Sequence, residues 1–583
     1  MMMARRVLMD LLLLLLILVL HYAGICGLTN GQQQLLRHAS ALSQAAPSNI
    51  TAAHHACQLW EELLTNEHES SWPPKIELLA CTLYAHCLVR VGNDPLAIQI
   101  LDRALAITNQ ERSNSPAPSQ NELYMTKGLS LQRMMQYDLA LKCFQKCLST
   151  DDEALMAAVT CALRLGQPKR ALELIEERHD TQQMTVDLRV LRSVLSQLLS
   201  SNPPMMSLGQ ALHDLSLEEE STTSILSRWL QFLYDPEQPW PYQEDPFSTS
   251  WITQLAQFNV GPLDDPLLRL LDDKVELHRL LSSGDDSSLS FWPQGYVWPE
   301  EAHLFSSSST PPSAHDSAKI DWWIWKRPTG YGSHGNQLVH ARDVERHHQS
   351  AEKNPPGERK LLQRVIHPTL LIGNQQKFSI RIYVILLPGP KAYVSRNQGL
   401  VKLAAASYKA SGTDKNPTTS NDDDIMEDMF LTNSGRGIEM QQESFDFLKE
   451  SMEQQGLSYD ELWHSMSESI QHVLRRYYSY GNTAVHNPTN TTTLTEQESI
   501  LSWHQVLTQH AAWPKILGWD YIVDEQGHPW LLEINRFPGI EPRNEQDRSV
   551  KARVLEDTWK LAKAHLHNTS AMERSLCLEE IVL

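Results

Sequence analysis

The sequence predicts two folded parts, an all-α domain followed by an α+β domain. A chain of 583 residues is too long for one hydrophobic core, so more than one domain is expected. Residues 52–199 carry apolar side chains at helical spacing, and the pattern repeats. Beyond residue 317, short runs rich in β-branched and aromatic residues alternate with helical stretches, which is typical of an α+β domain.

The first 27 residues have the form of a targeting segment. Arg5 and Arg6 precede an apolar run from Leu11 to Leu20, and small residues follow it. This order is typical of a secretory signal peptide, and the run is about half of the roughly 20 residues that a membrane span needs. We therefore expect a cleaved signal, or alternatively a signal-anchor in the membrane, and a location in the secretory pathway. If the segment is an anchor or a mistaken start of the gene, the rest of the chain is expected in the cytoplasm.

Residues 50–215 are predicted to form helical repeats. Small and apolar residues recur at one spacing in three copies: Ala97, Leu101 and Ala104; Ala140, Phe144 and Cys147; Ala171 and Ile175. In the middle copy Gly128 would let two helices approach closely, with Phe144 filling the groove toward the next unit. The pattern resembles tetratricopeptide repeats, and an irregular helical bundle is the alternative. Either one would serve as a scaffold for a protein partner.

The eight cysteines include no Cys-x-x-Cys pair of the kind that binds zinc or performs redox chemistry. Six of them, from Cys57 to Cys161, fall in the predicted helical region. We interpret these six as small buried core residues. A disulfide is the alternative.

Changes in composition mark the remaining boundaries. Residues 216–263 contain a stretch rich in proline, acidic and aromatic residues and are predicted to be a linker. The α+β domain is expected over 264–565, and 566–583 as a C-terminal tail. The formal charge of −20 argues against nucleic-acid binding, which needs a basic surface. It leaves open a local basic groove that receives an acidic peptide.

The first motif with chemical content is a strand, a lysine and a glycine-rich loop. Lys326 ends the predicted strand, and three glycines follow it: Gly330, Gly332 and Gly335. Glycines let backbone amides approach phosphate oxygens, and the lysine adds a positive charge. The motif lacks the Walker pattern and is weak evidence when it stands alone.

The second motif is a pair of cations on an apolar strand. Lys377 and Arg381 are four residues apart and therefore project from one face. Buried cations are unfavourable unless an anion meets them, so they indicate either a bound anion or a structural ion pair. Just upstream, Gln363 to Ile366 are expected to offer hydrogen bonds to an adenine ring.

The third motif is a hairpin with oxygen ligands, and its turn is expected at Asp524 to His528. Asp520 is expected to begin the first strand. Glu533 and Asn535, two residues apart on the second strand, share a face. Two carboxylates and an amide oxygen are hard ligands that suit Mg²⁺ held together with nucleotide phosphates.

In this order the three motifs resemble the tubulin–tyrosine ligase-like family, which has the ATP-grasp fold. The Leu-Thr-Asn motif at 431–433 and the segment 393–408 add to the resemblance, which covers about 264–564. It implies ATP and Mg²⁺ as cofactors and an amide-forming reaction through an acyl phosphate. It further implies an amino acid as co-substrate and a protein acceptor with an acidic tail, tubulin by analogy. A cytoplasmic form would then be associated with microtubules.

The resemblance also implies roles for individual residues. The phosphates would be contacted by Lys274, Lys326 and Lys377. The adenine would lie at Gln363, and Thr432 would touch the nucleotide. The metal ligands would be Asp520, Glu533 and Asn535. Arg381 and Lys402 would face the γ-phosphate and the acceptor carboxylate.

Two departures from the family pattern leave two hypotheses open. The family pattern Lys-Phe-Asp-x-Arg has Ser379 here in place of the aspartate. Lys402 replaces the usual arginine and cannot form the two-point fork to a carboxylate. The chain is therefore expected to be an active ligase or, alternatively, a weakened nucleotide-binding protein that uses its helical repeats as an adaptor.

Overall fold

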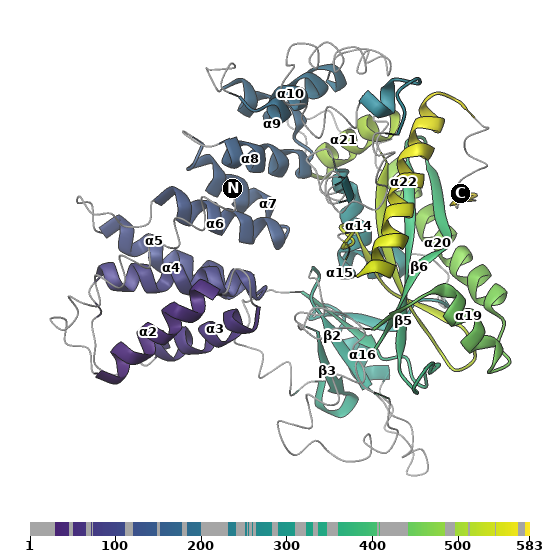
Figure 1. Ribbon diagram of the computed structural model, residues 1–583, viewed down its shortest axis with the longest axis horizontal. Coiled ribbons are helices and arrows are strands. Elements are labelled where there is room, and N and C mark those ends of the chain that lie inside the picture. Colours follow the sequence, from purple (N-terminus) through teal and green to yellow (C-terminus); the bar gives the residue numbers. More distant parts are fainter. Residues whose placement is uncertain are drawn as a thin grey trace. The chain divides into compact units, whose positions relative to one another are not determined.

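The computed structural model describes most of the chain (Figure 1). The described residues are 30–45, 50–65, 72, 74–110, 120–148, 152–177, 184–199, 231–240, 251–252, 255, 259, 264–282, 290–308, 322–329, 336–344, 346, 359–404, 407, 441–483, 496–510, 514–540, 542, 544–569 and 578–583. The chain divides into two compact units, one of residues 1–165 and 173–178, the other of 166–172 and 179–583. The predicted targeting segment, 1–27, lies outside the described residues.

The first unit is helical, as predicted. Its helices are α2 (Asn30–Ala45), α3 (Ile50–Thr65), α4 (Pro74–Arg90), α5 (Asp94–Gln110), α6 (Gln120–Arg133), α7 (Tyr137–Gln145) and α8 (Asp152–Arg164). Each packs against the next along the chain. Two more helices follow, α9 (Pro168–Glu176), which the two units share, and α10 (Val186–Leu198). No helix among the described residues combines the length and hydropathy needed to cross a membrane.

The expected close approach of two helices is found at Gly128. A Cβ atom added at Gly128 would lie 2.5 Å from Cε1 of Phe144, so the phenyl ring lies directly over the glycine. Phe144 therefore fills the space between α6 and α7 over Gly128, and its predicted contact toward the next unit stays a prediction. The six cysteines from Cys57 to Cys161 are free thiols, and five of them are buried, in keeping with core residues. The tetratricopeptide assignment stays a prediction.

The second unit contains two antiparallel sheets. One has the order β1-β4-β2-β3 and consists of β1 (Gly295–Trp298), β2 (Trp322–Lys326), β3 (Gln337–His340) and β4 (Lys360–Arg364). The other has the order β10-β6-β5-β8-β9, with β7 also paired to β6. Its strands are β5 (Phe378–Leu387), β6 (Lys391–Leu403), β7 (Gln442–Glu443), β8 (Lys515–Val523), β9 (Pro529–Asn535) and β10 (Leu578–Ile581). The four strands expected from β-branched and aromatic content are present as β2, β5, β6 and β9.

Helices accompany both sheets (Figure 1). Next to the smaller sheet are α16 (Ala302–Ser308) and η3 (Ala341–Asp343). The other helices of the unit are η2 (Pro266–Leu268), α14 (Arg269–Asp272), α15 (Lys274–Ser282), α19 (Phe445–Glu453), α20 (Tyr459–Thr483), α21 (Glu496–His510) and α22 (Glu545–Leu566). Alternate residues of β5, such as Ile380 and Ile382, share one core with Ile470 and Val473 of α20. Because side chains alternate along a strand, the residues between them point to the opposite face, where the candidate site lies.

Residues on both sides of the predicted range 264–565 contact the α+β domain. In the predicted linker 216–263, the carbonyl of Gln238 accepts a hydrogen bond from Lys563 of α22, 2.6 Å away. Trp240 and Trp251 are buried against each other there, because large aromatic side chains gain most from burial. In the predicted tail 566–583, β10 pairs with β6 and covers an edge of the sheet.

Candidate active site

Five of the predicted site residues lie on one face of the larger sheet: Arg381, Lys402, Asp520, Glu533 and Asn535. Arg381 of β5 is directly opposite Asp520 of β8, and Asp520 is opposite Glu533 of β9. On the other side of β5, Lys402 of β6 is opposite Ser379. β8 begins at Lys515, so the expectation that Asp520 begins its strand is wrong. Asp520 lies within β8 instead, and ladders on both sides hold it in place.

The carboxylate of Asp520 forms ion pairs with two basic side chains. The carboxylate receives a two-point ion pair from Arg381, in which Nη2 lies 2.6 Å from Oδ2 and Nε bonds Oδ1. Lys402 Nζ lies 3.4 Å from Oδ1. Burial opposes ionisation of Asp520, but the charges of Arg381 and Lys402 outweigh it and hold the pKa of this carboxyl below its ordinary value. Asp520 is therefore an anion at neutral pH.

Glu533 and Asn535 complete the acidic end of the site. Lys274, the first residue of α15, places Nζ 3.3 Å from Glu533 Oε2. Burial favours the neutral form of Glu533, yet Lys274 lowers the pKa of Glu533 overall. Asn535 Nδ2 donates to Asp520 Oδ2 at 3.3 Å and to Glu533 Oε1 at 3.4 Å. The three predicted metal ligands thus converge, as the hairpin pattern indicated.

Lys326 connects the two sheets. It ends β2, as predicted, and Nζ donates to Gln363 Oε1 at 2.7 Å and to the carbonyl of Leu532 at 3.1 Å. The register between β8 and β9 skips Leu532, so this bulge presents a carbonyl to the lysine. Gln363 is buried and holds Lys326, and the amides of Arg364 and Val365 already donate to backbone carbonyls. The adenine role of Gln363 stays a prediction.

Three lysines at the site are held where their charge is unfavourable. Lys377 precedes β5 by one residue and is 1% exposed, and burial lowers its pKa to about 7. Burial likewise lowers the pKa of Lys326 and the pKa of Lys402, each to about 8. Desolvated ammonium groups of this kind gain strongly from a bound anion.

The site carries more positive than negative groups. Its buried cations are Lys274, Lys326, Lys377 and Arg381, and Lys402 is partly buried beside them. Against these stand the ionised carboxylates of Asp520 and Glu533. A third carboxyl, Asp272, has a pKa raised by burial. The surplus of buried positive charge fits a ligand with several negative charges, such as the triphosphate of a nucleotide.

The oxygen donors fit Mg²⁺ when it arrives with phosphates. The carboxylates of Asp520 and Glu533 are hard ligands, and half a turn of the Asn535 amide would present Oδ1 in place of Nδ2. No group of three or more His, Cys, Asp or Glu side chains within the described ranges forms a metal site by itself. Because the surroundings are cationic, the residues suit a metal–nucleotide complex better than a bare ion.

Some predicted site residues lie outside the described residues, and some residues near the site were not predicted from the sequence. Gly330, Gly332, Gly335 and Thr432 fall outside the described residues. Asp272 and Arg536 were missed, although each is adjacent or nearly adjacent in sequence to a predicted residue, Lys274 or Asn535. The amide of Arg536 donates to Asp272 Oδ1 at 3.1 Å, which joins these two segments.

Lysines from two sheets that face paired carboxylates on a hairpin define an ATP-grasp domain, the fold of ATP-dependent carboxylate–amine ligases. Residues 274–571 match the tubulin-tyrosine ligase family, and the chain belongs to that family. The match does not extend into the helical N-terminal unit.

Relatives in this family are similar at low identity. The chain is 24% identical over 299 residues to tubulin monoglutamylase TTLL4 of Homo sapiens, which covers 50% of this chain and 22% of the relative. It is 26% identical over 243 residues to tubulin polyglutamylase TTLL6 of Homo sapiens, and this match covers 39% of the chain and 23% of the relative. It is 24% identical over 276 residues to probable tubulin polyglutamylase ttll-9 of Caenorhabditis elegans, and this match covers 46% of the chain and 57% of the relative. The chain therefore matches less than two thirds of the length of each of these relatives.

Proposed function

We propose that this chain is an ATP- and Mg²⁺-dependent ligase that joins an amino acid to a carboxylate of a protein acceptor. The observation that carries the proposal is the surplus of buried cations around Asp520 and Glu533. The names of the relatives, tubulin glutamylases, support glutamate as the amino acid and an acidic tail such as that of tubulin as the acceptor.

The reaction proceeds in two balanced steps. An oxygen of the acceptor carboxylate attacks the γ-phosphorus of ATP, and the bond to ADP breaks, which gives an acyl phosphate and ADP. The amine of the incoming amino acid then attacks the acyl carbon. Inorganic phosphate leaves with the former carboxylate oxygen, and the nitrogen loses a proton as the amide forms.

The side chains contribute position and charge to this reaction. Lys274, Lys326 and Lys377 hold the phosphates. Asp520, Glu533 and Asn535 would hold Mg²⁺, which neutralises phosphate charge. The protein therefore has to hold the reactants in place and balance their charge, and no side chain forms a covalent bond.

The acceptor side rests on Arg381 and Lys402. Arg381 is buried and Lys402 is partly buried, and both already form ion pairs with Asp520. An acceptor carboxylate would share these cations with Asp520 while Asp520 turns toward the metal. The distribution of charge is therefore expected to change when Mg²⁺ and the nucleotide enter.

A second candidate function is a nucleotide-binding adaptor with little or no turnover. The hydroxyl of Ser379 is buried and has no hydrogen-bond partner among the described residues, and it stands opposite Lys402. A carboxylate at this position would pair with Lys402, which here is drawn to Asp520 instead. The acceptor end of the site is thus less complete than the nucleotide end.

We further propose that the helical N-terminal unit recruits the acceptor, whether or not its helices are tetratricopeptide repeats. The segment 1–27 predicts the secretory pathway if it is a signal peptide, and the cytoplasm if it is an anchor or a mistaken start of the gene. Microscopy of the chain tagged at its C-terminus, with and without residues 1–27, would distinguish these compartments.

One assay tests the proposed function. The purified full chain is incubated with Mg²⁺, ATP, radiolabelled glutamate and tubulin, and both ADP release and label on tubulin are measured. The ligase hypothesis predicts both, and it predicts their loss in Glu533→Gln, which removes one carboxylate at nearly constant size. If the chain binds the nucleotide but does not modify tubulin or acidic peptides with glutamate or any other amino acid, the adaptor hypothesis is favoured.

A further inference from the structure

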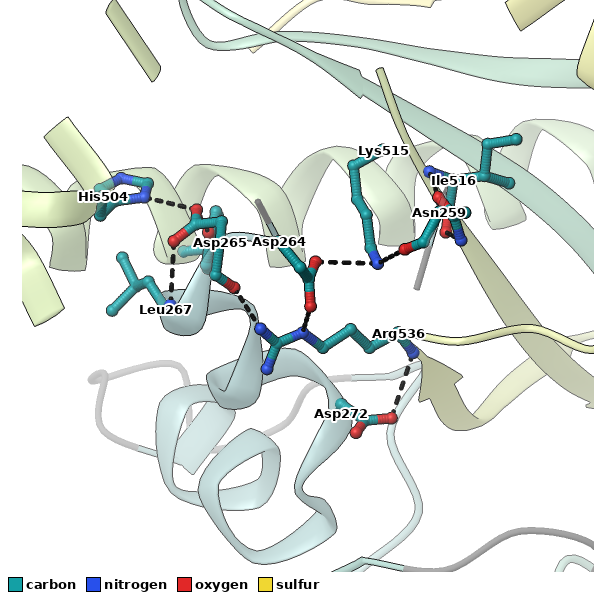
Figure 2. Close-up of polar contacts among 10 residues, drawn as sticks. Asn259, Asp264, Asp265, Leu267, Asp272, His504, Lys515, Ile516 and Arg536 are labelled. Carbon is teal, nitrogen blue, oxygen red and sulfur yellow. Dashed lines mark hydrogen bonds and ion pairs between the residues drawn. The ribbon is translucent and has the colours of Figure 1, made fainter. Parts of the chain in front are cut away.

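Arg536 directly follows Asn535, and its side chain reaches toward Asp264 and Asp265 (Figure 2). The side chain is 1% exposed. Its Nε lies 2.6 Å from Asp264 Oδ2, and Nη2 donates to the carbonyl of Asp265 at 2.7 Å. A guanidinium can make these two contacts at once because its donors are fixed in a plane. The end of β9 is therefore attached to residues 264–265 at two points.

The residues that receive Arg536 are themselves fixed. Asp265 accepts hydrogen bonds from Tyr477 at 2.9 Å and from the Leu267 amide at 3.0 Å. Its Oδ2 also lies 2.6 Å from His504 Nδ1. Asp264 Oδ1 lies 2.9 Å from Lys515 Nζ, so Asp264 has one cation on each side. A buried ion pair of this kind contributes more to a defined geometry than to net stability.

The backbone of Arg536 forms the other half of the connection. Its amide donates to Asp272 Oδ1, and Lys274 starts helix α15 two residues after Asp272. Lys274 in turn pairs with Glu533. Arg536 thus links two parts of the site. One is the end of β9, which carries the predicted metal ligands, and the other is the segment that begins α15 and carries the predicted phosphate contact Lys274.

We propose that Arg536 is a positioning residue, which holds Glu533 and Asn535 at the distance from Lys274 that Mg²⁺–ATP requires. The inference rests on the proposed function, because it concerns the same site. Arg536 does not contact the reacting groups; it acts through Asn535 on one side and through Asp272 on the other. Groups that orient metal ligands typically change metal affinity by about 10–100-fold when they are altered.

The test is a Mg²⁺ titration of ATP binding to the full chain by calorimetry. Arg536→Lys keeps the charge, but a single ammonium group cannot hold both Asp264 and the Asp265 carbonyl. We expect the Mg²⁺ concentration at half-maximal ATP binding to rise about tenfold. ATP binding without Mg²⁺ is expected to stay within about twofold of the original, because the phosphate lysines are unchanged.

Lys515→Met is the matched control. It removes the other cation of Asp264, so it also breaks an ion pair of this buried carboxylate, but it leaves both side-chain contacts of Arg536 in place. We expect destabilisation without a change in the Mg²⁺ midpoint. Equal shifts in Arg536→Lys and Lys515→Met, or no shift in either, would overturn the positioning role. Failure of the unaltered chain to bind ATP at any Mg²⁺ concentration would overturn the proposed function and this inference with it.

Discussion

Arg381 and Asp520 face each other across the β5–β8 ladder and form a two-point ion pair in which both side chains are buried. Asp520 also attracts Lys402 and is hydrogen-bonded by Asn535. This carboxylate is thus the point where the predicted nucleotide, metal and acceptor functions meet. A change in its partners is expected to affect all three.

Arg381→Lys tests the importance of the two-point geometry. Lysine keeps the charge but loses one of the two bonds to Asp520, so we expect a loss of about 1–3 kcal/mol of unfolding free energy. Urea unfolding of the variant and of the original chain measures this loss of unfolding free energy. The control is Arg396→Lys, because Arg396 forms an exposed pair with Glu579 at 3.7 Å and should change stability by less than about 1 kcal/mol. Equal effects in both variants would contradict a special role for the buried pair.

ATP affinity is expected to fall as pH rises. In the free protein burial lowers the pKa of Lys377 to about 7 and the pKa of Lys326 to about 8. Phosphate contacts favour the charged ammonium, so the pKa values rise in the complex and binding takes up protons. The ATP affinity is then highest below about pH 7. Above the pKa that each lysine has in the free protein, the affinity falls by up to about tenfold per pH unit for that lysine.

Calorimetry between pH 6.5 and 9 measures this dependence. Lys377→Arg is the control, since arginine stays charged and should flatten the curve. An affinity that is constant or increases with pH would show that the lysines do not meet the phosphates.

Gly518→Ala tests the space around Arg381. An added Cβ would lie 2.8 Å from Cβ of Pro538 and 3.0 Å from Cδ of Arg381. We expect a loss of about 1–3 kcal/mol of stability and weaker ATP binding, because Arg381 must shift. Gly539→Ala, with nothing within 4 Å of the added atom, should change stability by less than about 0.5 kcal/mol. A neutral Gly518→Ala would refute the close approach.

Gly128→Ala tests the helical unit independently. The new methyl group would meet the ring of Phe144, so α6 and α7 should exchange their amide protons faster, by an amount equivalent to about 1–3 kcal/mol. Phe144→Leu in the same chain should recover part of the loss. Unchanged exchange in the single variant would rule out the predicted helix contact.

The strands and the hairpin could be predicted because their signals are local. Alternation of side chains put Glu533 and Asn535 on one face, and the turn at Gly527, with φ of 85°, brought Asp520 beside them. The placement of Lys377 and Arg381 on one face followed from the same alternation. That Lys326 and these two residues belong to one site was indicated only by the family resemblance.

Other features depend on contacts between distant segments, which no local pattern contains. The attachment of Arg536 to Asp264 and Asp265 joins residues far apart in sequence, as does the bond from Lys326 to Leu532. The predicted linker contained proline and acidic residues, which suggested a loop, but its tryptophans are buried with α22 residues nearby. The strand β10 is only four residues long, too short for a periodic signal.

The most direct test of the central claim is a comparison of ATP, ADP and AMP binding to the full chain, with and without Mg²⁺. If the buried cations around Asp520 and Glu533 form a triphosphate site, affinity should increase at least tenfold from AMP to ATP. Mg²⁺ should strengthen ATP binding, and Glu533→Gln should remove that gain. Equal affinity for AMP and ATP, or no binding of ATP at all, would contradict the account.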